Sequence, residues 1–552
     1  MTRRAALIAA LAEAPESASP ARPLLDLAAL SLSHGLLPEG RSFLDRLGPD
    51  DTLDPAPRLA RHKLALLAWA LDGQRVPADR PERALLEAEA EDGWADRPLH
   101  LALDRARSGD AAAAAPHLGL AEMRLDALPP AVAEALLPEL LQTAIDAGAW
   151  ETGQALARRF DRHAGLRGGS AYRYLLGRAA AAHGDLVLAF DSFALSAEGA
   201  DAWAQRARIA LIDLGRDSGA LQVEDARSLL EHARRQWRGD ELELAVLERL
   251  VEAELDLGDR VAALSVLGEI IRRHPGSTAA EAAGPRADLL ITALYEAGAA
   301  GELPIAGFVA AHRRLAPEFM FRPGFAPATE ALAARLLEVG ATDAAAREYR
   351  MLRDQLAVQR DLDLAEVAPG RIARLALDET EALLQGGQAD RAAAVLAEAE
   401  PMLTADLADR AALLRARLHS ATGESDAVIA TRMGAPSEGY LLIRARAHFA
   451  RGEWAEARDA YAALRARPGA EVPAGDEINL LLAAHRAGDA ALVETLLADA
   501  PALVGRPEWA EVARHLAPAP PLALPLRQKS AQDRVQTAAD ALRRLELVAG
   551  DG

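Results

Sequence analysis

The chain has 552 residues, of which 51% are hydrophobic and 4% aromatic, and its net charge is −20 at pH 7. This charge argues against binding to nucleic acid, because a protein that neutralises phosphates needs a basic face. The chain has no cysteine, which excludes disulfides, thiolate metal ligands and a cysteine nucleophile.

The residue types favour helix, because Ala, Leu, Arg and Glu dominate while β-branched and aromatic residues are scarce. The basic residues are nearly all arginine, with Lys63 and Lys529 as the two lysines and Asn479 as the single asparagine. Because lysine and asparagine have A/T-rich codons, we infer a bacterial genome of high GC content. We expect a cytoplasmic protein, with the periplasm as the alternative.

Residues 1–22 form a separate N-terminal segment. It combines a basic start, a short apolar run from Ala5 to Ala12, and Ala-Glu-Ala before Pro15, which is similar to a signal peptide in miniature. The run is short and mostly alanine, so an ordinary first helix is the favoured interpretation, and a disordered or vestigial signal-like segment is the alternative. No stretch of the chain approaches the roughly 20 apolar residues that span a bilayer.

Residues 23–516 show helical periodicity, with apolar side chains three and four residues apart. A glycine recurs about every 35 to 40 residues, which is the length of one two-helix unit. The series comprises Gly109, Gly148, Gly184, Gly215, Gly258, Gly298, Gly340, Gly387, Gly423, Gly452 and Gly488.

The residues around each glycine follow a common spacing. Gly177, Gly184, Ala189 and Phe193 lie seven, five and four residues apart. We expect Gly184 to take a left-handed backbone between two helices, Ala189 to allow their close approach, and Phe193 to fill the space beneath them. The same pattern recurs in Gly452, Ala457 and Tyr461, in Gly258, Ala263 and Leu267, and in Gly340, Ala345 and Tyr349.

This spacing resembles the tetratricopeptide-repeat (TPR) class over roughly residues 95–505. The resemblance implies an all-α fold, an α-solenoid of stacked antiparallel helical hairpins with a right-handed superhelical twist. In that class the first helix of each unit lines a concave groove that holds partner peptides. Carried over by position, this role falls to Tyr174 and Arg178, and to Arg446 and Phe449. Each pair combines a flat apolar surface with a bidentate donor, although such residues can also simply cover the groove wall.

Residues 300–328 interrupt the repeat pattern. Pro317, Pro323 and Pro327 argue against a continuous helix here. We expect an irregular insertion, either a long loop packed by its own aromatic residues or a lip of a binding surface. The candidate binding residues are Phe308, Arg313, Phe319, Phe321, Arg322 and Phe325.

The chain after the repeats contains two further segments. Residues 517–528 predict an extended proline-rich linker. Residues 529–552 predict an amphipathic helix with one narrow apolar stripe that includes Val535 and Leu542. This helix either caps the last repeat or docks on a partner.

Motifs of catalysis are missing from the sequence. Neither lysine follows a glycine, which excludes a P-loop, and the spacings of zinc proteases, serine hydrolases and calcium loops do not occur. We therefore expect no enzyme activity, no cofactor and no metal. The resemblance implies a scaffold or assembly factor that binds other proteins. The signal-like N-terminus and the lack of cysteine give the more specific expectation of a bacterial envelope, motility or secretion apparatus. A regulatory or sensory adaptor that acts on a partner enzyme or transcription factor is the alternative.

Overall fold

A computed structural model describes residues 2–13, 20–88, 94–469, 472–498 and 528–550. Helices make up 78% of the protein, and the described residues contain no strand. The predicted all-α class is therefore confirmed. The chain divides into two compact units, Met1–Ala283 and Gly284–Gly552.

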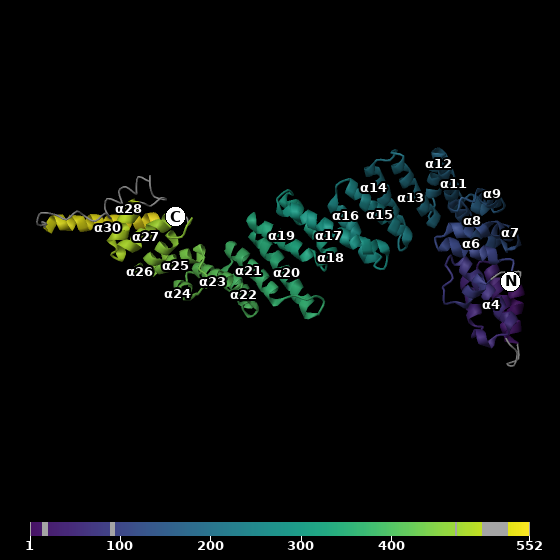
Figure 1. The fold of residues 1–552 in the computed structure, drawn as a ribbon, viewed down its shortest axis with the longest axis horizontal. Coiled ribbons are helices and arrows are strands. Elements are labelled where there is room, and N and C mark those ends of the chain that lie inside the picture. The colour runs from purple at the N-terminus through teal and green to yellow at the C-terminus, as the bar shows by residue number, and fades with distance from the viewer. Residues whose placement is uncertain (1, 14–19, 89–93, 470–471, 499–527, 551–552) are drawn as a thin grey trace. The chain divides into compact units, whose positions relative to one another are not determined.

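The N-terminal unit consists of antiparallel helical hairpins that follow one another in chain order (Figure 1). Helix α17, Thr278–Ala299, crosses the boundary between the units. The other elements are α1 Thr2–Ala12, α2 Ala21–Ser33, α3 Leu37–Asp45, η1 Asp50–Thr52, α4 Pro55–Leu71, α5 Pro81–Glu87, α6 Arg97–Arg107, α7 Ala111–Arg124, η2 Leu125–Ala127, α8 Pro130–Asp146, α9 Trp150–Arg159, η3 Phe160–Arg162, α10 Ala164–Arg167, α11 Ser170–Ala182, α12 Leu186–Ala197, α13 Ala202–Asp217, α14 Val223–Gln236, α15 Glu241–Asp256 and α16 Arg260–Arg273.

The C-terminal unit repeats the same arrangement, in which a second helix packs on its own first helix and on the first helix of the next hairpin. Its elements are α18 Ile305–Phe319, α19 Phe325–Glu338, α20 Thr342–Asp361, α21 Pro369–Gln385, α22 Ala389–Ala399, η4 Glu400–Met402, α23 Ala408–Ala421, α24 Ser425–Ala430, α25 Glu438–Ala450, α26 Trp454–Arg465, α27 Ala474–Arg486, α28 Ala490–Ala498 and α30 Gln528–Gly550.

Most hairpin turns contain a left-handed glycine that is directly followed by the N-cap residue of the second helix. Gly184 has a φ of 79°, a left-handed conformation that ends α11. Asp185 follows, and its carboxylate accepts a hydrogen bond of 3.1 Å from the backbone N–H of Leu188, which starts α12. The same Gly-Asp pair stands at residues 109–110, 258–259 and 488–489.

Nine of the eleven glycines in the predicted series have this left-handed conformation. The two exceptions, Gly215 and Gly298, lie inside α13 and α17, and the turns occur at Gly219 and Gly301 instead. Gly298 has another role, because a Cβ atom there would lie 2.5 Å from the ring of Phe308. A glycine at a close helix contact has the same sequence signature as a glycine at a turn.

The predicted repeat spacing matches the packing inside each hairpin. Ala189 and Ala457 are fully buried, and Phe193 and Tyr461 are buried beneath them. A Cβ atom on Gly177 would lie 2.6 Å from the ring of Phe193, so α11 and α12 approach closely. Small residues at fixed positions therefore bring the two helices of a hairpin together.

The expected irregular insertion at residues 300–328 is not a long loop. Its greater part is α18, an ordinary second helix of a hairpin. Pro317 lies in the last turn of α18 and Pro327 in the first turn of α19, where it has no helical N–H to supply, and Pro323 lies in the turn between them. The three prolines therefore lie near the ends of α18 and α19 or between them, and the connection between the two helices is short.

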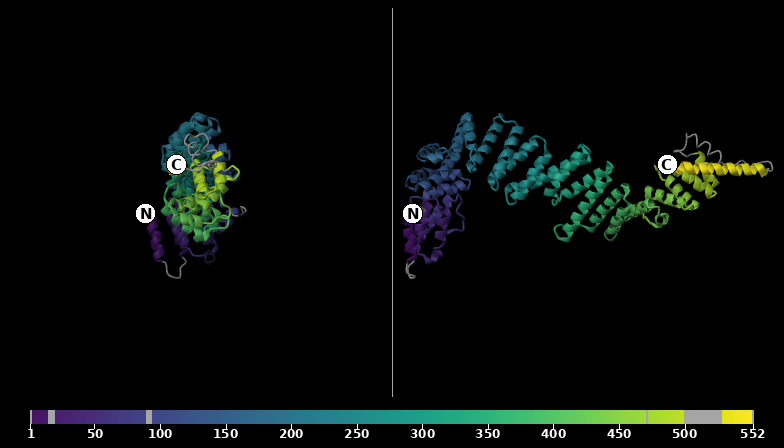
Figure 2. Two further views of the ribbon diagram at one scale, coloured as in Figure 1. Left: turned by 90° about the vertical axis from the view of Figure 1, so that its left-hand side faces the viewer. Right: turned by 180° about the vertical axis from the view of Figure 1, so that it is seen from behind.

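The two ends of the chain each contribute a helix. Within the predicted N-terminal segment, α1 packs on α2, as the interpretation of an ordinary first helix expects. At the other end α30, drawn in yellow, runs beside the last hairpin and contacts α27 (Figure 2). Residues 517–527 of the predicted linker lie outside the described residues.

Candidate functional site

Tyr174 and Arg178 lie on α11, the first helix of a hairpin, as predicted. Tyr174 is buried, however, and its ring centroid lies 5.8 Å from those of both Phe193 and Trp203. The Arg178 guanidinium is 2.7 Å from the carboxylate of Asp146 on α8. The structure therefore places the predicted pair in the packing between neighbouring hairpins.

Arg446 and Phe449 on α25 are engaged in the same way. Arg446 donates two hydrogen bonds, of 2.8 and 2.6 Å, to the carboxylate of Asp476 on α27. The ring of Phe449 meets that of Trp454 edge to face, with centroids 5.3 Å apart. Both side chains stabilise the end of the C-terminal unit.

Ion pairs between successive first helices are a general feature of both units. Arginine and carboxylate stand about one repeat apart in the sequence and connect one hairpin to the next. Besides the pairs of Arg178 and Arg446, they are Arg107–Glu139 at 2.6 Å, Arg249–Asp213 at 2.7 Å and Arg410–Asp378 at 2.7 Å. Arginines on this face thus hold the stack together.

The candidates from residues 300–328 divide into buried and exposed side chains. Phe308, Phe319 and Phe325 are core residues. Arg322 donates hydrogen bonds of 2.7 and 2.6 Å to Asp288 on α17. Arg313 is exposed and Phe321 is 69% exposed, so these two remain available to a partner.

A surface that the sequence analysis missed lies on α12. Its second-helix position leaves one side of α12 uncovered, and this side consists largely of apolar residues. Val187 is 75% exposed and Phe190 is 50% exposed. The α12 face comprises Leu186, Val187, Leu188, Phe190 and Leu195. The signal in the sequence is the run LVLAFDSFAL, which lacks the polar side that a surface helix normally has.

A second missed feature is a groove of about 460 Å³ between the C-terminal ends of α14 and α16. We call it the arginine groove, and it is lined by Glu231, Arg234, Arg235, Arg238, Glu269, Arg272 and Arg273. Its sequence signal is the Arg-Arg pair that ends each of two successive second helices. Cations in this position also stabilise the helix dipoles.

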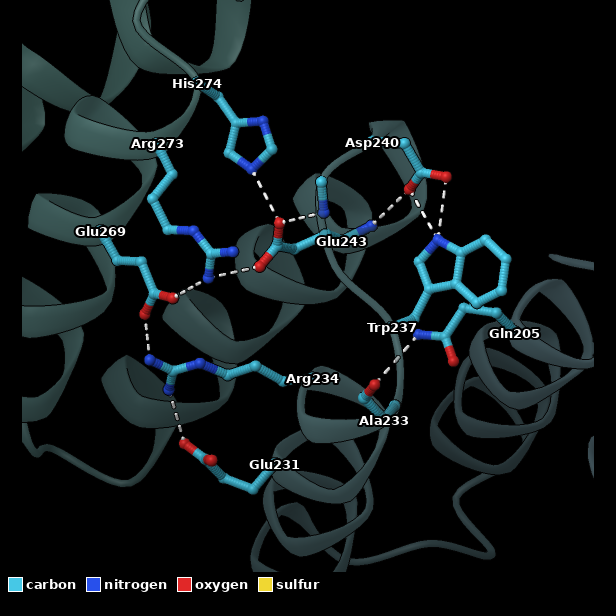
Figure 3. A network of polar contacts seen from close by, with 11 residues as sticks. Gln205, Glu231, Ala233, Arg234, Trp237, Asp240, Glu243, Glu269, Arg273 and His274 are labelled. Atoms are coloured by element: carbon cyan, nitrogen blue, oxygen red, sulfur yellow. Dashed lines mark hydrogen bonds and ion pairs between the residues drawn. The ribbon is translucent and has the colours of Figure 1, made fainter. Parts of the chain in front are cut away.

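Figure 3 shows how two arginines of the groove, Arg234 and Arg273, are held. The carboxylate of Glu269 bridges Arg234 and Arg273, and its contact with Arg273 measures 2.8 Å. Arg273 also lies 2.6 Å from the carboxylate of Glu243, which is fully buried below the groove. Glu243 is itself fixed by a hydrogen bond of 2.7 Å from the backbone N–H of Gly239.

The ionisable groups with the largest pKa changes lie inside the hairpins. Burial raises the pKa of Tyr295, Tyr349 and Tyr461, and burial lowers the pKa of His100 to about 4. All four side chains are buried. Their shifts follow from burial, and His100 also lines a cavity of about 10 Å³ together with Asp104 and Arg107. Among the described residues no three His, Asp or Glu side chains converge as metal ligands, and no helix is long and apolar enough to cross a bilayer.

No family model and no curated protein match the chain. Two of the solved structures that align with it cover almost its whole length. A structure described as Naa15/Naa10 bound to HypK-THB is 14% identical over 99% of this chain and 80% of that chain, with a TM-score of 0.23. A circular tandem repeat protein with novel repeat topology is 15% identical over 99% of each chain, with a TM-score of 0.09. Because both TM-scores are low, neither structure indicates a binding surface on this chain.

Proposed function

We propose that this protein is a non-catalytic scaffold that binds other proteins, and that the α12 face is its principal contact surface. The observation that supports the proposal is the exposure of neighbouring large apolar side chains on one helix. Burying one such side chain contributes about 1.5–3 kcal/mol, so a contiguous group of them favours association. Exposed apolar patches on soluble proteins mark interaction sites.

The charges around the α12 face define the chemistry of the partner. Asp185, Asp191 and Glu198 are exposed beside it, and α12 carries no lysine or arginine. A partner with complementary charge presents an amphipathic helix whose apolar stripe is bordered by basic residues. Such a helix buries its stripe on Val187 and Phe190 and places its cations near the carboxylates.

The absence of catalysis is part of the proposal. It is supported by the location of the four groups with the largest pKa shifts, Tyr295, Tyr349, Tyr461 and His100, which are buried within hairpins. A finer proposal is that the scaffold assembles a bacterial envelope, motility or secretion apparatus. The identity of the partner tests it, because components of such an apparatus support assembly, whereas a kinase or transcription factor supports a regulatory adaptor.

The test combines cross-linking with measured affinity. Lysine-directed reagents suit this protein poorly because it has two lysines, so a photo-reactive residue is placed at position 187 and the captured proteins are identified. Position 289 serves as the control, because Leu289 is 73% exposed and belongs to the other unit.

The captured partner is then purified and its affinity is measured. We expect the double variant Val187→Ser/Phe190→Ser to bind at least tenfold more weakly, a loss of about 1.4 kcal/mol, and Leu289→Ser to bind like the wild type. Equal capture at positions 187 and 289, or unchanged affinity of the double variant, contradicts the proposal.

A further inference from the structure

We infer that the arginine groove binds the carboxylate side chains of an acidic segment of a partner protein. The inference rests on the proposed function for one point, that the ligand is a protein. The site itself is formed by α14 and α16 and does not include the α12 face.

The lining of the groove is entirely charged. Five arginines and two glutamates surround a volume of about 460 Å³, and with Glu243 paired to Arg273 the groove keeps two excess positive charges in a chain whose net charge is −20. No apolar side chain lines the groove, so it suits an ionic ligand. Its size accommodates several side chains of an extended peptide.

The glutamates position the arginines. Glu269 bridges Arg234 and Arg273, and Glu231 lies 3.0 Å from Arg234 and 3.7 Å from Arg235. Each guanidinium has five N–H donors, so one or two internal contacts leave others available. A site whose arginines are already fixed loses less side-chain entropy when a ligand binds.

Buried Glu243 provides the deepest support for this arrangement. It lies 2.6 Å from Arg273, and its second oxygen accepts the hydrogen bond from Gly239 (Figure 3). A buried carboxylate that holds a cation at the mouth of a groove fixes that cation's position independently of solvent. Arg273 is therefore a rigid part of the site.

Two arginines at the rim are available for direct contact with the ligand. The side chain of Arg235 is 63% exposed and only loosely paired with Glu231. Arg238 is exposed and makes no ion pair with any described residue. Removing these two charges should weaken binding without disturbing the ion pair between Arg234 of α14 and Glu269 of α16.

A carboxylate ligand suits the whole molecule better than a nucleic acid does. Arginine binds carboxylates and phosphates in the same bidentate geometry. A nucleic acid, however, continues beyond a groove of this size, and the rest of the strongly acidic surface would repel it. A short acidic peptide contacts the groove alone.

The experiment measures binding of a fluorescent octaglutamate peptide to the full-length protein at low salt. We expect Arg235→Gln/Arg238→Gln to bind at least tenfold more weakly than the wild type, with an unchanged circular dichroism melt. The matched control is Arg158→Gln/Arg260→Gln, which removes two exposed arginines of the same unit outside the groove. We expect the control variant to bind like the wild type.

Three results would overturn the inference. In the first, the wild type does not bind the peptide. In the second, both double variants lose affinity equally, which would indicate only a general attraction between opposite charges. In the third, a single-stranded oligonucleotide binds more tightly than the peptide and depends on Arg235 and Arg238, which reassigns the groove to nucleic acid. The substitutions in the α12 face leave peptide binding unchanged, so failure of the groove and failure of the proposed function are distinguished.

Discussion

Individual small residues determine how closely the two helices of a hairpin approach. Ala189 lies at the crossing of α11 and α12, opposite Gly177, and Ala457 occupies the equivalent position in α26. A methyl group or a hydrogen is all that fits at these crossings. Because packed interiors do not deform easily, a larger side chain must displace a whole helix.

We predict that Ala189→Leu or Ala457→Leu destabilises its hairpin by about 1–3 kcal/mol through overpacking. Urea denaturation followed by circular dichroism measures the change. Ala455→Leu is the control, because Ala455 is exposed on the same helix as Ala457. Unchanged denaturation of both buried variants would show that the repeat register is wrong.

Buried His100 gives the protein a defined response to acid. Burial lowers its pKa from 6.5 to about 4, and its ring stacks on Trp94 with centroids 5.1 Å apart. Between these two pH values the unfolded chain binds a proton that the folded protein does not bind. Acidification through this range therefore favours unfolding.

We predict that His100→Phe removes this part of the pH dependence while it keeps an aromatic ring against Trp94. The difference in unfolding free energy between variant and wild type should change by about 3 kcal/mol from pH 7 to pH 4, in favour of the variant. Denaturation at a series of pH values measures it. Parallel pH profiles of variant and wild type would show that the pKa of His100 is the same in the folded and the unfolded protein.

At the scale of elements, the sequence predicted turns better than surfaces. The Gly-Asp turns and the buried alanines follow from local backbone and packing requirements, so spacing reveals them. Arg178, in contrast, forms an ion pair with Asp146, a residue of the neighbouring hairpin. Residue type and helix position therefore suggested a binding face, whereas the contact between hairpins makes it an internal one.

Residues 300–328 illustrate the same limit. Three prolines and four phenylalanines suggested an irregular insertion. Yet proline is compatible with the ends of helices, and Phe308 and Phe319 fill the interior of their hairpin. Only the positions of the helix ends, which tertiary packing determines, distinguish the two outcomes.

Helix α30 packs on the last hairpin with one side and is exposed to solvent on another. Leu542 packs against the apolar cluster that includes Leu481 of α27 and Leu496 of α28, whereas Val535 is 69% exposed. A single helix of this length has little stability of its own, so its contact with α27 determines whether it is formed. The structure thus favours a cap. The exposed side around Val535 is the part of α30 on which a partner could dock.

We predict that Leu542→Ser destabilises the last hairpin by about 1 kcal/mol, because it removes apolar contact with the cluster that includes Leu481 and Leu496. Val535→Ser is the control and should leave thermal unfolding unchanged. Deletion of residues 526–552 should lower solubility. If the deletion changes neither melting nor solubility but abolishes binding of the native partner, α30 is a partner-binding tail instead of a cap.

At the scale of the whole molecule, most contacts join helices of the same or of neighbouring hairpins, although α8 also contacts α2 and α4. α12, for example, packs on α11 and α13, and the interhelical ion pairs join residues about one repeat apart. Stability of such a stack is approximately a sum of terms for each repeat and for each interface between neighbours. The loss of a distant hairpin therefore leaves the remaining ones folded.

We predict that a fragment of residues 1–300, which keeps α17 whole, folds by itself. Helix α17 contributes Ala280 and Ala283 to the buried residues of the N-terminal unit, so the fragment ends after this helix and does not cut it. The fragment should show a helical circular dichroism spectrum and a cooperative melt close to that of the corresponding transition in the full chain. Because the α12 face and the arginine groove both lie within these residues, the fragment should also bind octaglutamate with wild-type affinity. A fragment that is unfolded would show that the two units stabilise each other, and that the nearest-neighbour description fails for this chain.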